Sequence, residues 1–521
     1  MSCFLRRLEH HRDVSNALNV SSFHMEDLPL EIQHLVISRL SMKEVAKASI
    51  VARNWRKLWT CYPNLCFDGT TDLSTDEGSV KIETAKFIET VNSIIHQHNG
   101  IGLNKFSIRF SLQKKSSHHL DRWISFAAAS KARIIDINLW PKRKSVGPAI
   151  KACNFPLEAL GAQDGPFIQS LFLKDVSIKP HMEIRGFAEL RRFCLHCVQI
   201  IGNLGDLLLS CFALEDLELI ACSGVTNLNI PHRLDKLRHL LVSGRRIQMV
   251  NFHVPALIHF EFQGNAIPIA LHGCSNLEKA SLMFKTAFKR DNKALGHAFT
   301  AIPCISAVKM LNVYADMEAR EPVWAPQVPG VFHFHLSILF TWVLIIFPNV
   351  LNLFQVHKLM ASPTCMFMFL RHLTCEIRVF TNGPNSHDGI LQLAHYLEFA
   401  PQLEVLQLHV STIHMFYYTL EDSWHGKVKW VGGSCARSLD HLKSVYMSGF
   451  RCYRAQVELL CGILEKGAAL EHVTIEPKVI IKCVSEINLY VPEEMVRKWA
   501  QRTSELFGKA INVVEGSSVL C

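Results

Sequence analysis

The sequence lacks the short motifs that carry the commonest catalytic chemistries. It contains no G-x-x-x-x-G-K-[ST] phosphate loop, no G-x-G-x-x-G after a predicted strand, no H-E-x-x-H and no G-x-S-x-G. One C-x-x-C, spanning Cys194 and Cys197, has no second pair and indicates structural thiols rather than a zinc site. We therefore expect a non-enzymatic chain with no catalytic residues, no metal site and no cofactor.

Signals for nucleic acid, secretion and disulfides are missing too. The basic stretch RRIQMVNFH from Arg245 is short and typical of a solvated loop, so no nucleic-acid partner is expected. Residues 1–24 hold no apolar run of about 7–15 residues, which predicts a disordered extension rather than a secretory signal. The 17 cysteines are scattered singly, which favours reduced, buried thiols in an intracellular protein of the nucleus or cytoplasm.

Composition describes a large globular chain. With 521 residues it is too long for one ordinary core, so several domains or a repeat array are expected. Hydrophobic residues make up 49% and charged residues 19%, which is typical of folded proteins. The net charge of +9 is mild for this length and by itself indicates no particular partner.

A compact apolar block stands near the start, LPLEIQHLVISRLSMKEVAKASIVARNWRKLW, from Leu28 to Trp59. Helical spacing predicts a first helix whose apolar stripe consists of Leu28, Ile32, Leu35, Val36 and Leu40, with Pro29 in its first turn. Ser41 followed by Glu44 forms an S-x-x-E capping box and predicts a second helix. A third helical segment would follow Val51. Three short helices are marginal as an independent core, so either the next domain or another protein covers their apolar surface.

This block resembles an F-box, with its Leu-Pro opening, spaced aliphatic residues and Trp-Arg-x-Leu-Trp close. The resemblance implies a three-helix F-box domain over 25–69 that docks on a Skp-type adaptor and, through it, on a cullin. Carried over position by position, the expected adaptor-binding residues are Leu28, Pro29, Ile32, Leu35, Leu40, Val51 and Trp55.

The pattern apolar-x-x-apolar-x-apolar recurs thirteen times after this block. It begins at residues 103, 134, 168, 190, 214, 237, 257, 277, 308, 370, 403, 442 and 470. From 168 to 277 the steps are 22, 24, 23, 20 and 20 residues, within the range of leucine-rich repeats. Each hexad predicts a short strand whose alternate apolar residues face inward while the x positions line a concave face. A two-layer α/β domain is the alternative.

An F-box followed by irregular leucine-rich repeats resembles the plant F-box/LRR proteins, and residues 439–477 resemble the FBD module that closes many of them. Gly449, Phe450, Val457, Leu460 and Leu464 match that module, but Cys452 and Tyr453 stand where a glycine is usual. The predicted fold class is α/β: a three-helix F-box, an irregular leucine-rich-repeat horseshoe and an FBD-like C-terminal cap. The predicted boundaries are 25–69 for the F-box, 100–434 for the repeats, 435–480 for the FBD-like module and 481–521 for a C-terminal tail.

Residues 328–355 interrupt the repeats with a segment that has no Asp, Glu, Lys or Arg. Its length would allow a membrane span, but its histidines, Pro348 and its place inside a repeat array argue against one. The segment corresponds to a whole number of codons, and its removal shortens the step between hexads 308 and 370 from 62 to 34 residues. A retained intron is the favoured hypothesis, with a lineage-specific insert and a membrane span as alternatives.

The resemblance implies a substrate-recognition subunit of a Skp-cullin-F-box (SCF) ubiquitin ligase whose repeats hold a protein target. The target-binding residues cannot be read from the sequence. Two alternatives stay open, a repeat-based interaction or decoy protein without a ligase role and a receptor that depends on a small molecule.

Overall fold

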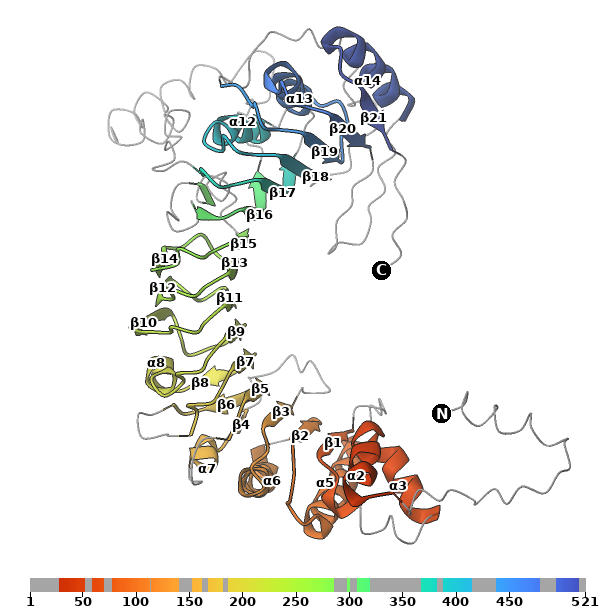
Figure 1. The fold of residues 1–521 in the computed structure, drawn as a ribbon, viewed down its shortest axis with the longest axis vertical. Helices are drawn as coiled ribbons and strands as arrows, with labels where there is room; N and C mark the ends of the chain where they lie inside the picture. Colours follow the sequence, from red (N-terminus) through yellow and green to blue (C-terminus); the bar gives the residue numbers. More distant parts are fainter. Residues whose placement is uncertain are drawn as a thin grey trace, which may run out of the picture.

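The computed structural model describes thirteen stretches of the chain: 28–51, 59–69, 77–112, 114–139, 152–161, 167–180, 186–284, 298–299, 307–318, 367–381, 388–414, 437–477 and 493–514. Together they form an open arc with the N-terminal helices at one end and the last helix at the other (Figure 1). A long sheet follows the inner side of this arc (Figure 1). The arc is the horseshoe that the repeat pattern predicts.

The inner sheet has fifteen strands, and each pairs in parallel with its neighbours. In order they are β1 (Asn64–Asp68), β2 (Lys105–Arg109), β3 (Ile134–Asn138), β5 (Ser170–Lys174), β7 (Arg192–His196), β9 (Asp216–Ile220), β11 (His239–Gly244), β13 (His259–Gly264), β15 (Lys279–Phe284), β16 (Met310–Glu318), β17 (His372–Thr381), β18 (Val405–His414), β19 (Ser444–Ser448), β20 (His472–Glu476) and β21 (Ile511–Val513). All thirteen predicted hexads supply consecutive strands, β2 to β20. The repeat prediction is confirmed, and the two-layer alternative is wrong.

Side chains alternate along these strands as the hexads predict. In β11, Leu240 and Val242 are fully buried while His239, Leu241 and Ser243 on the other face are only half-buried. Successive strands stack equivalent buried residues, so Leu217, Leu240 and Phe260 form one continuous row. Burial of these rows between the inner sheet and the outer elements drives the stacking of one repeat on the next.

The outer side of the arc changes with repeat length. Between residues 153 and 272, where all but the first step are 20–24 residues long, the chain returns through short strands that form two small parallel sheets. These are β4 (Cys153–Asn154), β6 (Val176–Ile178) and β8 (Gln199–Ile200), and β10 (Asn227–Arg233), β12 (Met249–His253) and β14 (Ile269–His272). Two short helices, α7 (Leu157–Gly161) and α8 (Leu204–Leu208), lie in this part.

Longer repeats use helices instead. The described ones are α5 (Glu77–Gln97), α6 (Ser117–Ala129), α12 (Gln392–Leu397), α13 (Arg454–Lys466) and α14 (Glu493–Phe507), with 3₁₀ turns η2 (Trp59–Cys61), η3 (Lys114–Ser116) and η7 (Asp388–Leu391). Helix α6 buries Leu120, Trp123 and Ile124, and the Trp123 indole donates to Asn92 Oδ1 of α5 at 2.8 Å. Across the described residues, no helix is both long and apolar enough to cross a membrane.

The N-terminal helices α2 (Leu30–Arg39) and α3 (Met42–Val51) are joined by the predicted capping box. Glu44 accepts from the backbone N–H of Ser41 at 2.7 Å, and the Ser41 hydroxyl accepts from the N–H of Glu44 at 3.3 Å. Pro29 lies just before the first turn, at the N-cap of α2, rather than within it as predicted. The predicted third helix falls mostly on 52–58, outside the described residues.

Two expected boundaries are less sharp in the structure. Strand β1 lies within the range assigned to the F-box, yet it pairs with β2 and begins the inner sheet. Residues 493–514, assigned to a C-terminal tail, form helix α14 and strand β21, and β21 pairs with β20. The sheet therefore extends one strand beyond the repeat pattern at each end. The sequence did not predict these strands, because β1 and β21 do not follow the hexad spacing.

The predicted insert 328–355, like the extension 1–24, lies outside the described residues. On either side of it, β16 pairs directly with β17 over nine register positions, from Met310–His372 to Glu318–Phe380. The inner sheet therefore continues from β16 to β17 without an intervening described strand.

Candidate functional site

The outward face of α2 is one candidate surface. The side chains of Ile32 and Leu35 are 41% and 54% exposed, whereas Ile37 is 1% exposed and faces the core together with Val45 of α3. Residues three apart on a helix lie on the same face, so Ile32 and Leu35 form one apolar patch. An exposed patch of large apolar side chains is typical of a surface that another protein covers.

The other predicted adaptor-binding residues are distributed around this patch. Pro29 is exposed and Leu28 is half-buried, and the backbone carbonyl of Leu28 accepts from the Gln33 side chain at 2.7 Å. Leu40 is half-buried and packs against the core. Val51 ends α3, and its side chain, like the whole of Trp55, lies outside the described residues.

A second candidate site lies on the concave face of the inner sheet, where β9, β11 and β13 bring together carboxylates and imidazoles. His239 Nδ1 is 2.7 Å from Asp216 Oδ1. His239 Nε2 and His259 Nε2 lie 3.8 Å and 3.0 Å from the same oxygen, Oε1 of Glu261. The two imidazole rings stack with centroids 4.9 Å apart. We call Asp216, His239, His259 and Glu261 the concave histidine cluster.

Charge is concentrated in this cluster. The hydrogen bond to Asp216 and the nearby Glu261 carboxylate raise the pKa of His239 to about 9, while the same bond lowers the pKa of Asp216. The imidazoles of His239 and His259 hold the pKa of Glu261 well below its ordinary value. Each carboxylate is therefore ionised at neutral pH and faces at least one imidazole.

The Asp216–His239 pair resembles the carboxylate–imidazole half of a nucleophilic triad, but among the described residues no hydroxyl or thiol is found beside Nε2 of His239. His239 Nε2 faces the Glu261 carboxylate, and a carboxylate there cannot be activated by proton removal. The cluster is therefore suited to binding a cation or a polar group rather than to acyl transfer.

Polar groups continue on either side of the cluster. On β7 and β9, His196 Nε2 lies 3.1 Å from Glu218 Oε2, and the Arg192 guanidinium pairs with Asp216 at 3.0 Å. Burial, with the neighbouring Glu218 carboxylate, raises the pKa of the Cys194 thiol to about 12, so this thiol is protonated and unreactive. All eleven cysteines of the described stretches are free, and seven of them are buried. Cys66 and Cys197, the second cysteine of the C-x-x-C, are exposed, so the expectation of buried thiols does not hold for these two.

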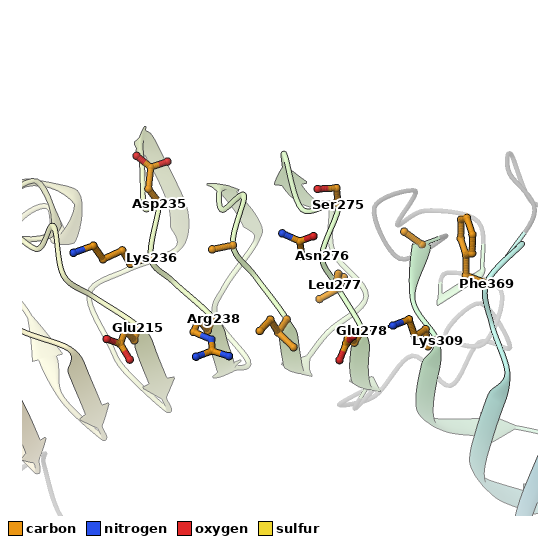
Figure 2. A pocket seen from close by; sticks show the side chains of 13 residues that line it. Glu215, Asp235, Lys236, Arg238, Ser275, Asn276, Leu277, Glu278, Lys309 and Phe369 are labelled. Atoms are coloured by element: carbon orange, nitrogen blue, oxygen red, sulfur yellow. Dashed lines mark hydrogen bonds and ion pairs between the residues drawn. The ribbon is translucent and has the colours of Figure 1, made fainter.

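An open groove of about 850 Å³ runs along the edge of the sheet where the strands begin. Figure 2 shows Glu215, Arg238, Glu278 and Lys309 along one side of it and Phe369 at its far end. Glu278 and Lys309 form an ion pair at 2.8 Å, while Phe369 is 62% exposed. A long groove with charged walls and an apolar end suits an extended polypeptide better than an enclosed small molecule.

The concave histidine cluster was not among the sites predicted from the sequence. The signal was present, because the hexads from Leu237 and Leu257 both carry histidine at their third position. Twenty-residue spacing with parallel pairing places His239 directly beside His259. Recognising this requires reading the hexads as aligned rows rather than one at a time.

Comparison with known proteins assigns most of the chain. The profile of the At1g61320/AtMIF1 LRR domain matches residues 94–340 and 337–498, and the F-box domain profile matches residues 25–66. The F-box/LRR resemblance is thereby confirmed.

Several Arabidopsis thaliana proteins are similar in sequence. The FBD-associated F-box protein At1g66310 is 25% identical over 202 residues, which are 37% of this chain and 40% of that protein. The F-box/LRR-repeat protein At3g58900 is 26% identical over 45% of this chain and 71% of its own length. The F-box/FBD/LRR-repeat protein At1g13570 is 23% identical over 45% of this chain and 52% of its own length.

The two profiles agree with the structure, because the LRR match covers strands β2 to β20 and the F-box match covers α2 and α3. The chain therefore belongs to the At1g61320/AtMIF1 LRR-domain family and carries an F-box domain ahead of its leucine-rich repeats.

Proposed function

We propose that this protein is the substrate-recognition subunit of an SCF-type ubiquitin ligase in the nucleus or cytoplasm. Its F-box would dock on a Skp-type adaptor and thereby on a cullin, while the repeats hold a protein target. The observation that carries this proposal is the outward apolar patch of Ile32 and Leu35 on an F-box domain at one end of the arc.

The adaptor would supply the apolar cover that this patch lacks. Ile37 and Val45 already face the body of the protein, and Tyr62 donates from its hydroxyl to the Leu40 carbonyl at 2.7 Å, so the F-box is anchored on one side. Leu28, Pro29, Ile32, Leu35, Leu40, Val51 and Trp55 are the proposed adaptor contacts. Among them, the exposed Ile32 and Leu35 would contribute most, because they have the most apolar area to lose.

The target would bind the concave face or the groove at its edge. Both present charged side chains along the parallel sheet, and Figure 2 shows those of the groove, Glu215, Arg238, Glu278 and Lys309. The chain would perform no chemistry itself. It would raise the effective concentration of the target beside a ubiquitin-carrying enzyme, which accelerates transfer through proximity.

Residues 435–480 are proposed to be an FBD-like module. Their described part follows the expected order of strand β19, Gly449–Phe450, helix α13 and strand β20, and two of the relatives carry FBD in their names. Helix α14 packs beyond this module through Val496, Ala500 and Trp499, which places Trp499 against Phe450 with ring centroids 4.8 Å apart. We propose that α14 completes the C-terminal cap.

The test is co-expression with a plant Skp-type adaptor followed by size-exclusion chromatography. The unmodified chain is expected to co-elute with the adaptor, and a Leu28→Ala/Pro29→Ala variant is expected to lose co-elution while remaining folded. Failure of the folded, unmodified chain to co-elute would overturn the ligase proposal and leave a repeat-based binding protein. Stabilisation of bound partners, rather than their turnover, would indicate the decoy alternative.

A further inference from the structure

The proposed adaptor role does not account for the concave histidine cluster. We propose that His239, His259 and Glu261 form a three-ligand site for a divalent transition-metal ion, for which Zn²⁺ is the best match. Asp216 acts as a positioning residue that orients His239. The proposal concerns the cluster alone and does not depend on adaptor binding.

The distances fit a metal site. Zn²⁺ binds imidazole nitrogen and carboxylate oxygen at about 2.0–2.2 Å, so two ligand atoms of a tetrahedral site are about 3.3–3.5 Å apart. Glu261 Oε1 lies 3.0 Å from His259 Nε2 and 3.8 Å from His239 Nε2, which brackets that separation. The candidate ligand atoms of all three residues lie within 4.8 Å of one another. Small side-chain rotations therefore suffice to place a metal ion between them.

The ring nitrogens lack other partners. His239 Nε2 and His259 Nε2 are buried and meet no strict hydrogen-bond geometry, and the Glu261 carboxylate, at 3.8 Å and 3.0 Å, is the group that each of them faces. Buried polar atoms are nearly always satisfied, so two neighbouring exceptions require an explanation. A metal ion would displace the proton from His239 Nε2 and would then bind the lone pairs of both Nε2 atoms.

Asp216 completes the expected surroundings of a zinc-bound histidine. A metal-bound imidazole almost always donates its other N–H to a carboxylate or carbonyl, which fixes the ring orientation. Asp216 Oδ1 is 2.7 Å from His239 Nδ1, and the Arg192 guanidinium holds the other oxygen, Oδ2, at 3.0 Å. Because Nδ1 of His239 is bound to Asp216, Nε2 is the ring nitrogen that can bind the metal.

The backbone preorganises the three ligands. His239 and His259 are register partners on neighbouring strands, and Glu261 follows His259 by two residues on the same face of β13. Leu240 and Phe260, the next residues along each strand, are fully buried and hold both strands in place. No backbone movement is needed, and the remaining coordination position opens toward the concave face, where a water molecule would complete the site.

The donor set narrows the choice of metal. Two imidazoles and one carboxylate suit Zn²⁺ and its neighbours Co²⁺ and Ni²⁺, whereas Mg²⁺ and Ca²⁺ prefer all-oxygen ligands. The Glu261 carboxylate would cancel one of the two positive charges of the ion, because the charge of Asp216 is already paired with Arg192. Zn²⁺ is favoured because three protein ligands with one open position is a common zinc arrangement.

The test uses the purified full chain, stripped of metal with a chelator. Titration with Co²⁺ is followed by visible absorption, and Zn²⁺ affinity is measured by competition with a chromophoric chelator. We expect one equivalent of either ion per chain, with a Co²⁺ spectrum of low coordination number. His259→Gln and Glu261→Gln are expected to abolish this binding, and Asp216→Asn to weaken it by about 10–100-fold.

The matched control is His372→Gln, because His372 is exposed on the same sheet face at β17, away from the cluster. This variant should bind Zn²⁺ like the unmodified chain. Circular dichroism confirms that each variant is folded. Absence of saturable Zn²⁺ binding by the folded, unmodified chain would overturn the proposal, as would binding that persists in both His259→Gln and Glu261→Gln. Either outcome would identify the cluster as an ion-pair network only.

Discussion

Replacing Leu35 with alanine tests whether the outward face of α2 is the adaptor surface. Leu35 is 54% exposed in the free chain, so a partner can still bury about half of its surface. Full burial of a leucine side chain stabilises by about 1.5–3 kcal/mol, and roughly half of that gives about 0.8–1.6 kcal/mol. The adaptor affinity of Leu35→Ala should therefore fall by about 4–15-fold.

The stability of the free chain should respond differently. Alanine has the higher helix propensity, and only the buried part of Leu35 is lost, so the free energy of unfolding should change by less than about 1 kcal/mol. Adaptor affinity is measured by biolayer interferometry with purified adaptor, and stability is measured by urea denaturation. Adding Ile32→Ala, which removes a side chain 41% exposed on the same face, should weaken adaptor binding further.

The matched control is Ile82→Ala on α5, because Ile82 is 58% exposed but lies outside the F-box match. It should leave adaptor affinity unchanged. Unaltered affinity in the Ile32→Ala/Leu35→Ala variant would refute the assignment of this face. An equal loss in Ile82→Ala would show that general surface hydrophobicity, rather than the α2 face, drives the association.

Three further predictions concern the solenoid itself. Gly224→Ala should lower the free energy of unfolding by clearly more than the cost of a left-handed alanine alone, which is about 1–2 kcal/mol. The reason is that φ is +88° and an added Cβ would lie 1.9 Å from the Ile200 carbonyl oxygen. The control in urea denaturation is Gly508→Ala, where φ is +64° and the space around the residue is open. Equal losses in the two variants would contradict the clash. Burial lowers the pKa of His98 below 6.5, and its Nδ1 accepts from the Gly100 N–H at 3.0 Å. The neutral imidazole therefore contributes its full share to the free energy of unfolding above about pH 6.5, and this contribution should fall as the pH drops toward the folded-state pKa. In His98→Gln the fall between pH 7.5 and 5.5 should be shallower, whereas the exposed His472→Gln should retain it; identical slopes in all three proteins would exclude His98 as the cause. Deleting 328–355 should leave the far-UV circular dichroism and the Tm close to those of the full chain, because β16 and β17 already pair directly. A molten or aggregated deletion variant would show that the segment belongs to the fold, and its uniform presence in sequenced transcripts would contradict a retained intron.

The repeat architecture can be predicted from the sequence because the residues of each hexad determine by themselves which side chains are buried. In LRHLLV from Leu237, the alternation of apolar and polar residues determines which side chains enter the core, and the structure buries Leu237, Leu240 and Val242. The capping box at Ser41 is equally local, since both of its hydrogen bonds lie within four residues. Features of this kind depend on neighbours in the chain and can therefore be read from the sequence.

Other features depended on long-range contacts. The apolar stripe of the first helix did not reveal that Ile37 faces the core while Leu35 faces water, because the covered side depends on residues distant in the chain, such as Tyr62, which donates to the Leu40 carbonyl. Strands β1 and β21 join the inner sheet through pairing with β2 and β20, although neither follows the hexad spacing.

The concave histidine cluster shows the same division most clearly. The sequence determined that His239 and His259 point away from the core, since each precedes a buried residue in an alternating strand. Only the parallel register, repeated every 20 residues, placed one imidazole on the other and brought Glu261 and Asp216 beside them. Side-chain direction is set by the local backbone, but proximity across strands is set by how the repeats stack, and that is a property of the tertiary structure alone.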